Sequence, residues 1–309
     1  MDTLRCKEYQ KLLGLTTDEL VFRANKVRKA HIRSKIELCG IVNAKSGVCG
    51  EDCKFCAQSA KYCTNVPIYP LMTKAEILEE AKKAYDNGAE RFGIVTSGNR
   101  LTKDEIEGVS GTITAISKNT EINVCASLGA LSEEDFLALK EAGLIRYHHN
   151  IETSERYYSS IVSTHDYDER INTIKVAKNA GLEVCSGGIL GMGETWQDRI
   201  DMAVLLKELN VSSVPLNFLI PIKGTPMENV KPISPIDAIR SIALFRIILE
   251  DVIIKVVAGR ESVLRDFQGM MYLAGANGMM VGGYLTVKGG SPCDDKELLK
   301  EIRKLWNVE

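Results

Sequence analysis

The sequence predicts an α/β protein, a closed (β/α)8 barrel of the TIM type preceded by a helical extension. From residue 36 onward, apolar runs of about six to eight residues alternate with longer amphipathic stretches. There are eight such runs. Strand–helix units of this kind imply parallel strands joined by helical crossovers, and eight units fit a closed barrel. We expect residues 1–35 to form the extension and residues 36–309 to form the barrel.

The eight expected strands are short apolar runs. They cover residues 36–43, 91–96, 122–127, 145–151, 183–190, 214–220, 253–258 and 279–282. An open, doubly wound sheet would show a similar alternation. No G-x-G-x-x-G motif follows an early strand, however, which weakens the dinucleotide-binding alternative.

Capping residues mark the expected helices between these strands. Thr73 with Glu76, and Thr102 with Glu105, form capping boxes. Further helix starts are expected at Ser132, at Asp166 and at Ser234, which precedes a proline. Residues 3–35 show near-helical spacing of apolar side chains and are expected to cap the barrel.

Composition limits the class of protein. The chain has 309 residues, of which 45% are hydrophobic and 26% charged, as in ordinary globular proteins. A net charge of −2 gives no argument for binding nucleic acid or an anionic membrane. We find no apolar run long enough to span a bilayer and no signal-peptide core, so we expect a cytoplasmic protein. Its nine cysteines are then metal ligands or reduced thiols rather than disulfides.

Cys49, Cys53 and Cys56 form a C-x3-C-x2-C motif directly after the first expected strand. Three thiolates so close in sequence can hold one face of an iron–sulfur cube and leave the fourth iron open to a small molecule. Zinc is the alternative, with Cys63 as a possible fourth ligand, although zinc sites more often use C-x2-C pairs. Barrel active sites lie at the carboxyl ends of the strands, so the other strand ends should face this loop.

The motif is that of radical S-adenosylmethionine (SAM) enzymes, and residues 45–60 closely resemble the biotin synthase family. The resemblance extends from about residue 36 to residue 290. It implies a [4Fe–4S] cluster on Cys49, Cys53 and Cys56 that cleaves SAM to a 5′-deoxyadenosyl radical. It further implies conversion of dethiobiotin to biotin with sulfur from an auxiliary Fe–S cluster. A flavodoxin- or ferredoxin-type electron donor and a homodimer are implied as well.

The same resemblance assigns residues that bind SAM and substrate. Glu152 stands where the family usually has Asp, and a carboxylate of either length can accept both ribose hydroxyls. Read alone, each residue also has a structural interpretation, such as a turn, a packed side chain or a solvated charge. The assignments are Thr96 to the amino end of SAM, Asn150 and Glu152 to its ribose, Arg170 to its carboxylate, the strand of Ile189 to its adenine, Asn150 and Asn217 to dethiobiotin, and Thr286 and Lys288 to the substrate carboxylate.

The auxiliary cluster shows a departure from the family. The family pattern is three cysteines, from the second, third and fifth strands, and one arginine. Cys125, Cys185 and Arg260 match three of these positions, but Gly93 occupies the second-strand position. We expect Cys39 on the first strand to replace the missing thiol, because neighbouring strands are only about 5 Å apart.

Several alternatives for this second site stay open. The cluster can be [2Fe–2S] or a four-iron cluster with an open or sulfide-bearing iron. Cys63 or a non-protein sulfur could complete it while Cys39 merely packs. Cys125 and Cys185 could also be packed thiols, and Cys6 and Cys293, near the termini, are expected to be surface or packing thiols.

Two other functions fit part of the sequence. Hydrogenase maturation enzymes and related radical SAM proteins share the barrel and the cysteine loop. A cluster carrier without enzymatic activity would also use many cysteines, but it would not explain Asn150, Glu152 and Asn217 at the strand ends. Formation of 5′-deoxyadenosine from SAM distinguishes an enzyme from a carrier.

Overall fold

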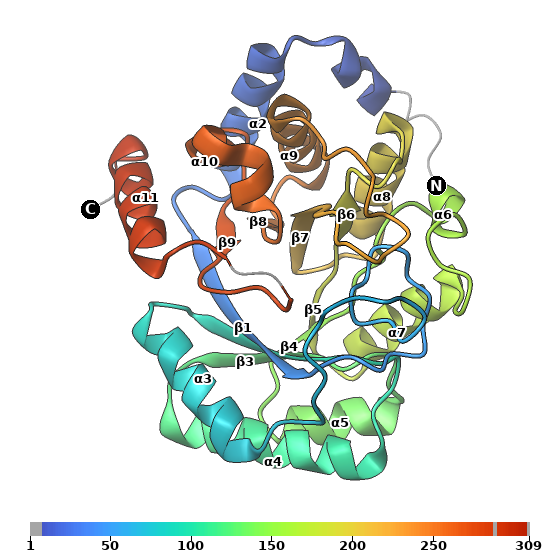
Figure 1. Cartoon of the computed structure of the whole chain (residues 1–309). Helices are drawn as coiled ribbons and strands as arrows, with labels where there is room; N and C mark the ends of the chain where they lie inside the picture. Colours follow the sequence, from blue (N-terminus) through green and yellow to red (C-terminus); the bar gives the residue numbers. More distant parts are fainter. Residues whose placement is uncertain (1–7, 287–288, 308–309) are drawn as a thin grey trace.

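The computed structural model describes residues 8–286 and 289–307, and a closed parallel barrel forms its centre (Figure 1). Strand β1 pairs with both β2 and β9, and β5 pairs with β7, so the sheet has no open edge. The expected barrel is therefore confirmed, and the open sheet is excluded. The strands are β1 (Glu37–Lys45), β2 (Arg91–Thr96), β3 (Asn123–Ser127), β4 (Arg146–His148), β5 (Glu183–Cys185), β6 (Gly188–Leu190), β7 (Ser213–Phe218), β8 (Ile253–Val256) and β9 (Gly278–Met280).

The expected fifth strand is interrupted and forms β5 and β6. A Cβ atom on Gly187 would lie 2.0 Å from the carbonyl oxygen of Pro215, and one on Gly188 would lie 2.1 Å from that of Glu152. Only glycine permits such close approach of two backbones. The two glycines thus let the chain pass tightly beside β7 and beside the segment that follows β4, where the pocket described below begins.

Helices surround the barrel and begin largely where their capping residues predict (Figure 1). Capping boxes are present at Thr73, Thr102 and Ser132, and the Ser234 hydroxyl accepts a hydrogen bond from the backbone N–H of Asp237. Asp166 precedes its helix but makes no side-chain cap. The barrel helices are α3 (Lys74–Asp86), α4 (Lys103–Asn119), α5 (Glu133–Glu141), α6 (Glu155–Tyr158), α7 (Tyr167–Asn179), α8 (Trp196–Glu208) and α9 (Pro235–Leu249).

The amino- and carboxyl-terminal segments pack together on the outside of the barrel. Helix α2 (Thr17–His31) lies against α9. From α9 the Arg240 guanidinium donates a hydrogen bond to the carbonyl oxygen of Leu13, before α2, at 3.1 Å. Arg28 stacks on the Trp306 ring with its guanidinium carbon 3.8 Å from the ring centre. The remaining elements are η1 (Lys11–Gly14), η2 (Arg260–Leu264), η3 (Arg265–Phe267), α10 (Gln268–Leu273) and α11 (Pro292–Leu305). Within residues 8–286 and 289–307, no helix has the length and apolar character needed to cross a bilayer.

A buried ion network lies at the amino-terminal end of the barrel. The Glu37 carboxylate accepts hydrogen bonds from Lys255 at 2.7 Å, Arg146 at 2.6 Å and Arg91 at 2.8 Å. Burial alone would raise the pKa of Glu37, but Lys255 and Arg146 outweigh it and lower that pKa far below its usual range. Glu37 therefore stays ionised and ties β1 to β2, β4 and β8.

Replacing Glu37 with Gln should destabilise the fold at pH 7 by about 3–5 kcal/mol, because three cations would then share no buried carboxylate. The folded-state pKa of Glu37 is lowered, so its contribution is present above the ordinary carboxyl pKa of about 4.3 and is lost as the pH falls. The difference between wild type and variant in urea unfolding should accordingly shrink in acid. Glu79→Gln, which removes an exposed ion pair with Lys82, is the control and should leave the midpoint of urea unfolding unchanged. A Glu37→Gln midpoint equal to that of the wild type would contradict the role of Glu37.

Candidate active site

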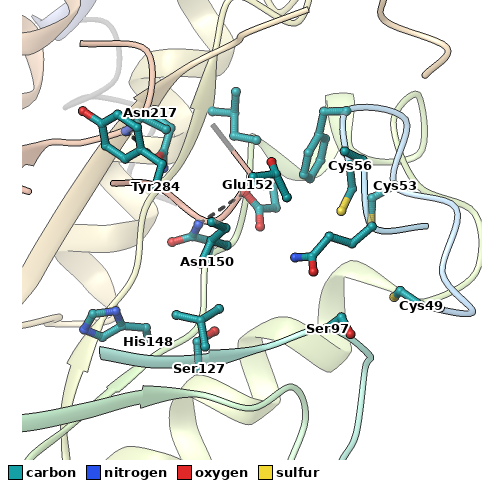
Figure 2. Close-up of a pocket in the computed structure, with 18 of the residues that line it drawn as sticks. Cys49, Cys53, Cys56, Ser97, Ser127, His148, Asn150, Glu152, Asn217 and Tyr284 are labelled. Atoms are coloured by element: carbon teal, nitrogen blue, oxygen red, sulfur yellow. Dashed lines mark hydrogen bonds between the residues drawn. The ribbon is translucent and has the colours of Figure 1, made fainter. Parts of the chain in front are cut away.

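A cavity of about 400 Å³ opens at the carboxyl ends of the barrel strands. Its volume falls in the range of about 300–1,000 Å³ typical of small-molecule sites. Every described residue assigned above to the cysteine motif, to SAM or to dethiobiotin lines it. These residues are Cys49, Cys53, Cys56, Thr96, Asn150, Glu152, Arg170, Ile189, Asn217 and Thr286. Figure 2 labels six of them: Cys49, Cys53, Cys56, Asn150, Glu152 and Asn217. Lys288 lies outside the described residues.

The loop that carries the three motif cysteines is fixed to two other segments. Cys49 forms a backbone bridge with Ser59, which closes the loop on itself. The Asp52 carboxylate accepts hydrogen bonds from the backbone N–H groups of Ser163 at 2.8 Å and Thr164 at 3.2 Å. The loop is thus held against the segment before α7, and its three cysteines lie on one side of the cavity (Figure 2).

Cys53 and Cys56 of this loop are in surroundings that disfavour free thiolates. Burial raises the pKa of Cys53 to about 12 and that of Cys56 to about 11, and Arg170 only partly opposes the shift of Cys53. A positively charged metal centre would reverse this preference, because metal ligation requires the thiolate. Across the described ranges, no three Cys, His, Asp or Glu side chains converge to hold a single metal ion. Cys63, the fourth ligand that zinc would need, is exposed, which argues against zinc.

Glu152 and Asn150 lie in the middle of the cavity, between the motif cysteines and Asn217 (Figure 2). Glu152 has a positive φ of 67°, which is uncommon for a non-glycine residue and typical of functional sites. Burial raises its pKa, with Arg170 opposing. The Asn150 side-chain oxygen accepts a hydrogen bond from the backbone N–H of Gly187 at 3.2 Å, which fixes its orientation.

Arg170 is held by four groups at the wall of the cavity. It donates to the Tyr158 hydroxyl at 2.7 Å and to the Asn150 carbonyl oxygen at 2.9 Å, and it lies 3.8 Å from the Glu152 carboxylate. Its fourth contact is His165 Nε2 at 2.8 Å. The solvated helix charge considered from sequence is therefore excluded, since Arg170 reaches inward from α7.

His165 connects Arg170 to the cysteine loop. Its Nδ1 lies 2.9 Å from the Glu51 carboxylate, while its Nε2 faces Arg170. Burial and Arg170 lower the pKa of His165 against the opposing effect of Glu51, so the ring is neutral near pH 7. A neutral ring that donates from Nδ1 to Glu51 leaves Nε2 to accept from Arg170.

Thr96 and Asn217 differ in how their polar atoms are used. The Thr96 hydroxyl is buried and has no hydrogen-bond partner within the described structure, which leaves it for a ligand. The Asn217 side chain instead donates to the Gly188 carbonyl oxygen at 3.1 Å and accepts from the Ala258 N–H at 3.2 Å. One N–H and one lone pair of its amide remain available. Asn217 therefore has a structural role in joining strand ends, in addition to any contact with substrate.

Cys39, Cys125 and Cys185 are buried on strands β1, β3 and β5, below the cavity. Burial raises the pKa of Cys39, and a nearby Cys185 thiolate adds to this effect. Burial likewise raises the pKa of Cys125 to about 12, with Cys39 contributing. Cys39 thus interacts electrostatically with each of the other two thiols, so all three lie in one region of the barrel interior. A Cβ atom on Gly93 would lie 3.1 Å from the side chain of Ile41, so the second-strand position has little spare room.

Arg260 does not lie with these thiols. Its guanidinium donates to Asp295 at 2.6 Å, to Glu261 at 2.8 Å and to Gln268 at 2.7 Å, beside helix α11. The reason is Gly259, whose φ of 83° turns the chain out of β8 so that Arg260 begins η2. The structure thus corrects the expected fourth member of the auxiliary site. The cation that contacts Cys39 is Lys255, with its Nζ 3.0 Å from the sulfur.

Sequence reasoning missed four residues of this region: Glu51, His148, His165 and Lys255. His148 lines the cavity, and its buried Nε2 has no partner in the described structure. Lys255 carried a usable signal, because a lysine within an apolar strand is unusual. His165 carried none, since only folding brings it between Glu51 and Arg170.

Comparison with known proteins identifies the family. The sequence profile of the Radical SAM superfamily matches residues 44–206, and that of the Biotin and Thiamin Synthesis associated domain matches residues 215–302. The biotin synthase of Thermotoga petrophila is 52% identical over 96% of this chain and 98% of its own length. The chain belongs to the biotin synthase family. Another family member, from Geobacter sulfurreducens, is 44% identical over 98% of this chain and 92% of its own length.

Solved structures outside the family share the fold. Methylornithine synthase superimposes with a TM-score of 0.81 at 18% identity, over 98% of this chain and 93% of that chain. A maturase of the [FeFe]-hydrogenase gives a TM-score of 0.81 at 19% identity, over 96% of this chain and 70% of that chain. At such identity the likeness concerns the barrel alone. The biotin synthase family is thus distinguished from hydrogenase maturation by sequence and not by fold.

Replacing His165 with Phe should weaken SAM binding about 5- to 10-fold, because Arg170 would lose one of its acceptors and the cysteine loop its link to α7. His165→Gln, which can still accept a hydrogen bond, should restore much of the affinity. Titration calorimetry of the cluster-loaded protein measures the SAM affinity of both variants. His31→Phe, at the exposed end of α2, is the matched control. A SAM affinity in His165→Phe equal to that of the wild type would show that Arg170 needs no support from His165.

Proposed function

We propose that the chain is an enzyme that converts dethiobiotin to biotin, the last step of biotin biosynthesis, by radical SAM sulfur insertion. The observation that carries the proposal is the arrangement of two sets of three thiols along the barrel axis. One set lines the cavity on the loop after β1, and the other lies below it on three barrel strands. The residues assigned to SAM and dethiobiotin lie at the cavity between the loop and the strand ends.

The cysteine loop would hold a [4Fe–4S] cluster through Cys49, Cys53 and Cys56. When bound, this cluster and SAM supply a 5′-deoxyadenosyl radical that removes hydrogen from the substrate. The protein would orient the bound groups and exclude water from them, because the thiols, Glu152 and Arg170 are all partly or fully buried. The contacts of Arg170 with Tyr158 and His165 would keep its guanidinium fixed for the SAM carboxylate.

Asn150 and Glu152 would orient the nucleoside part of SAM, and Thr96 would offer its unpartnered hydroxyl to the amino end. Ile189 supplies an apolar wall for the adenine. Dethiobiotin would lie on the side of Asn217, whose free N–H and lone pair suit a ureido group. Thr286 lines the same cavity and is proposed for the substrate carboxylate.

Cys39, Cys125 and Cys185 would hold the auxiliary cluster that donates sulfur. These side chains are buried in one region of the barrel interior, and Lys255 contacts Cys39, which fits an anionic Fe–S centre. Both a [2Fe–2S] cluster and a four-iron cluster with an open or sulfide-bearing iron fit three thiolates. Mössbauer spectra with iron and sulfide analysis of the anaerobic protein distinguish them.

Three predictions from the resemblance concern partners and location. They are a flavodoxin- or ferredoxin-type electron donor, a homodimer and a cytoplasmic setting. No contact in the described structure bears on them, so they stay predictions.

Changing Cys53 to Ala should abolish formation of 5′-deoxyadenosine from SAM, because two thiolates are too few to hold the cube. Circular dichroism should show an intact fold, since Cys53 lies on a loop that other residues anchor. The exposed Cys63→Ala is the matched control and should retain SAM cleavage. SAM cleavage at the wild-type rate in Cys53→Ala would refute the assignment of the loop.

Changing Cys39 to Ser should remove or alter the auxiliary cluster and stop biotin formation while SAM cleavage continues, because Cys39 lies beneath the SAM cavity and does not line it. The measurement combines Mössbauer spectra with product analysis by mass spectrometry. Cys293→Ser, at an exposed position, is the control. An auxiliary spectrum unchanged in Cys39→Ser would remove Cys39 from the ligand set and favour a non-protein sulfur or Cys63.

A further inference from the structure

Lys255 is a fully enclosed cation that points at a thiol. It lies on β8, is 2% exposed, and its Nζ is 2.7 Å from Glu37 Oε1 and 3.0 Å from Cys39 Sγ. A Cβ atom on Gly278 would lie 2.8 Å from the Lys255 side chain, so glycine on β9 keeps the path of that side chain open. The side chain is thus guided by its neighbours toward one sulfur.

The charges around Lys255 do not balance. Arg91, Arg146 and Lys255 contribute three positive charges, whereas Glu37 and Glu183 contribute two negative charges. Glu183 is also 41% exposed, so solvent screens its charge. Excess positive charge in a barrel interior is costly unless an anion lies beside it. The anions available there would be the thiolates that Cys39, Cys125 and Cys185 present when they hold a cluster, and any sulfide bound with them.

We propose that Lys255, held by Glu37, is the cationic partner of the auxiliary sulfur centre and donates a hydrogen bond to the Cys39 sulfur or an adjoining sulfide. The inference rests on the proposed function, because it presumes a cluster on Cys39, Cys125 and Cys185. An ammonium has three N–H donors and no lone pair, so Lys255 acts on sulfur and is not an iron ligand. Its role is to position Cys39 and to offset the negative charge of the centre.

The fold can tolerate loss of this cation. In Lys255→Met, Glu37 keeps its bonds to Arg146 and Arg91, so no buried carboxylate is left unpaired. Methionine also fills a similar volume. Lys255→Arg retains the positive charge but replaces the compact ammonium group with a planar guanidinium group. The matched control is Arg260→Lys, which changes another buried cation just after β8 that is bonded to Asp295 and not to a thiol.

The test compares anaerobically reconstituted proteins by iron and sulfide content, Mössbauer spectra, and the reduction potential of the auxiliary cluster. Lys255→Met should lower that potential, because a positive charge near the cluster favours the reduced form, or should lose the auxiliary signal. Lys255→Arg should change the potential less, and Arg260→Lys should match the wild type. SAM cleavage should continue in all three variants. An unchanged auxiliary potential and spectrum in Lys255→Met would overturn the inference.

A second measurement needs no variant. Wild-type protein labelled with ¹⁵N-lysine should show only weak nitrogen coupling to the reduced auxiliary cluster in pulsed electron paramagnetic resonance. A strong coupling, as from a nitrogen bonded to iron, would overturn the assignment of Lys255 to sulfur. Absence of any second cluster in the wild type would overturn the proposed auxiliary site together with this inference. A second cluster that persists unchanged in Lys255→Met would overturn the inference alone.

Discussion

The Glu37 carboxylate is the interaction on which the interior of this barrel depends. It joins cations from β2, β4 and β8 to β1 at one buried point. Strands that pair only through backbone hydrogen bonds can shift register, but a charge network that spans four strands fixes them. The positions of Cys39 on β1 and Cys125 on β3 follow from that register, since Cys39 pairs with Arg91 and Cys125 with Arg146.

The barrel then separates two chemical environments along its axis. The Glu37 ion network and the buried thiols lie below the cavity, and the cavity with its polar and charged walls lies at the carboxyl-terminal end. His148, on β4, belongs to both environments. It lines the cavity, and its pKa is lowered by burial and by Lys255 and Arg146 of the ion network. A ligand in the cavity would therefore lie close to both the cysteine loop and the buried thiols.

The cavity is held by backbone features that leave little freedom. Gly187 and Gly188 allow β5, β6 and β7 to approach closely, and Glu152 is fixed in a left-handed conformation by its bridge to Gly188. Asn217 joins β6 to the end of β8 through its amide. Such preorganisation suits radical chemistry, because a reactive carbon must be held at one distance from its partner and away from water.

The sequence by itself determined the features that depend on local spacing. These include the alternation of strands and helices, most of the capping residues, the cysteine loop and the described strand-end residues that line the cavity. The interrupted fifth strand and the missing side-chain cap of Asp166 are exceptions. The family could be recognised for the same reason. Only the tertiary structure decided what depends on side-chain direction inside the barrel. Gly259 turns Arg260 away toward Asp295, while Lys255, five residues earlier, reaches Cys39. Contacts between segments far apart in the sequence, such as Lys255 with Cys39 or His165 with Glu51, arise only when the barrel forms, so no local pattern encodes them.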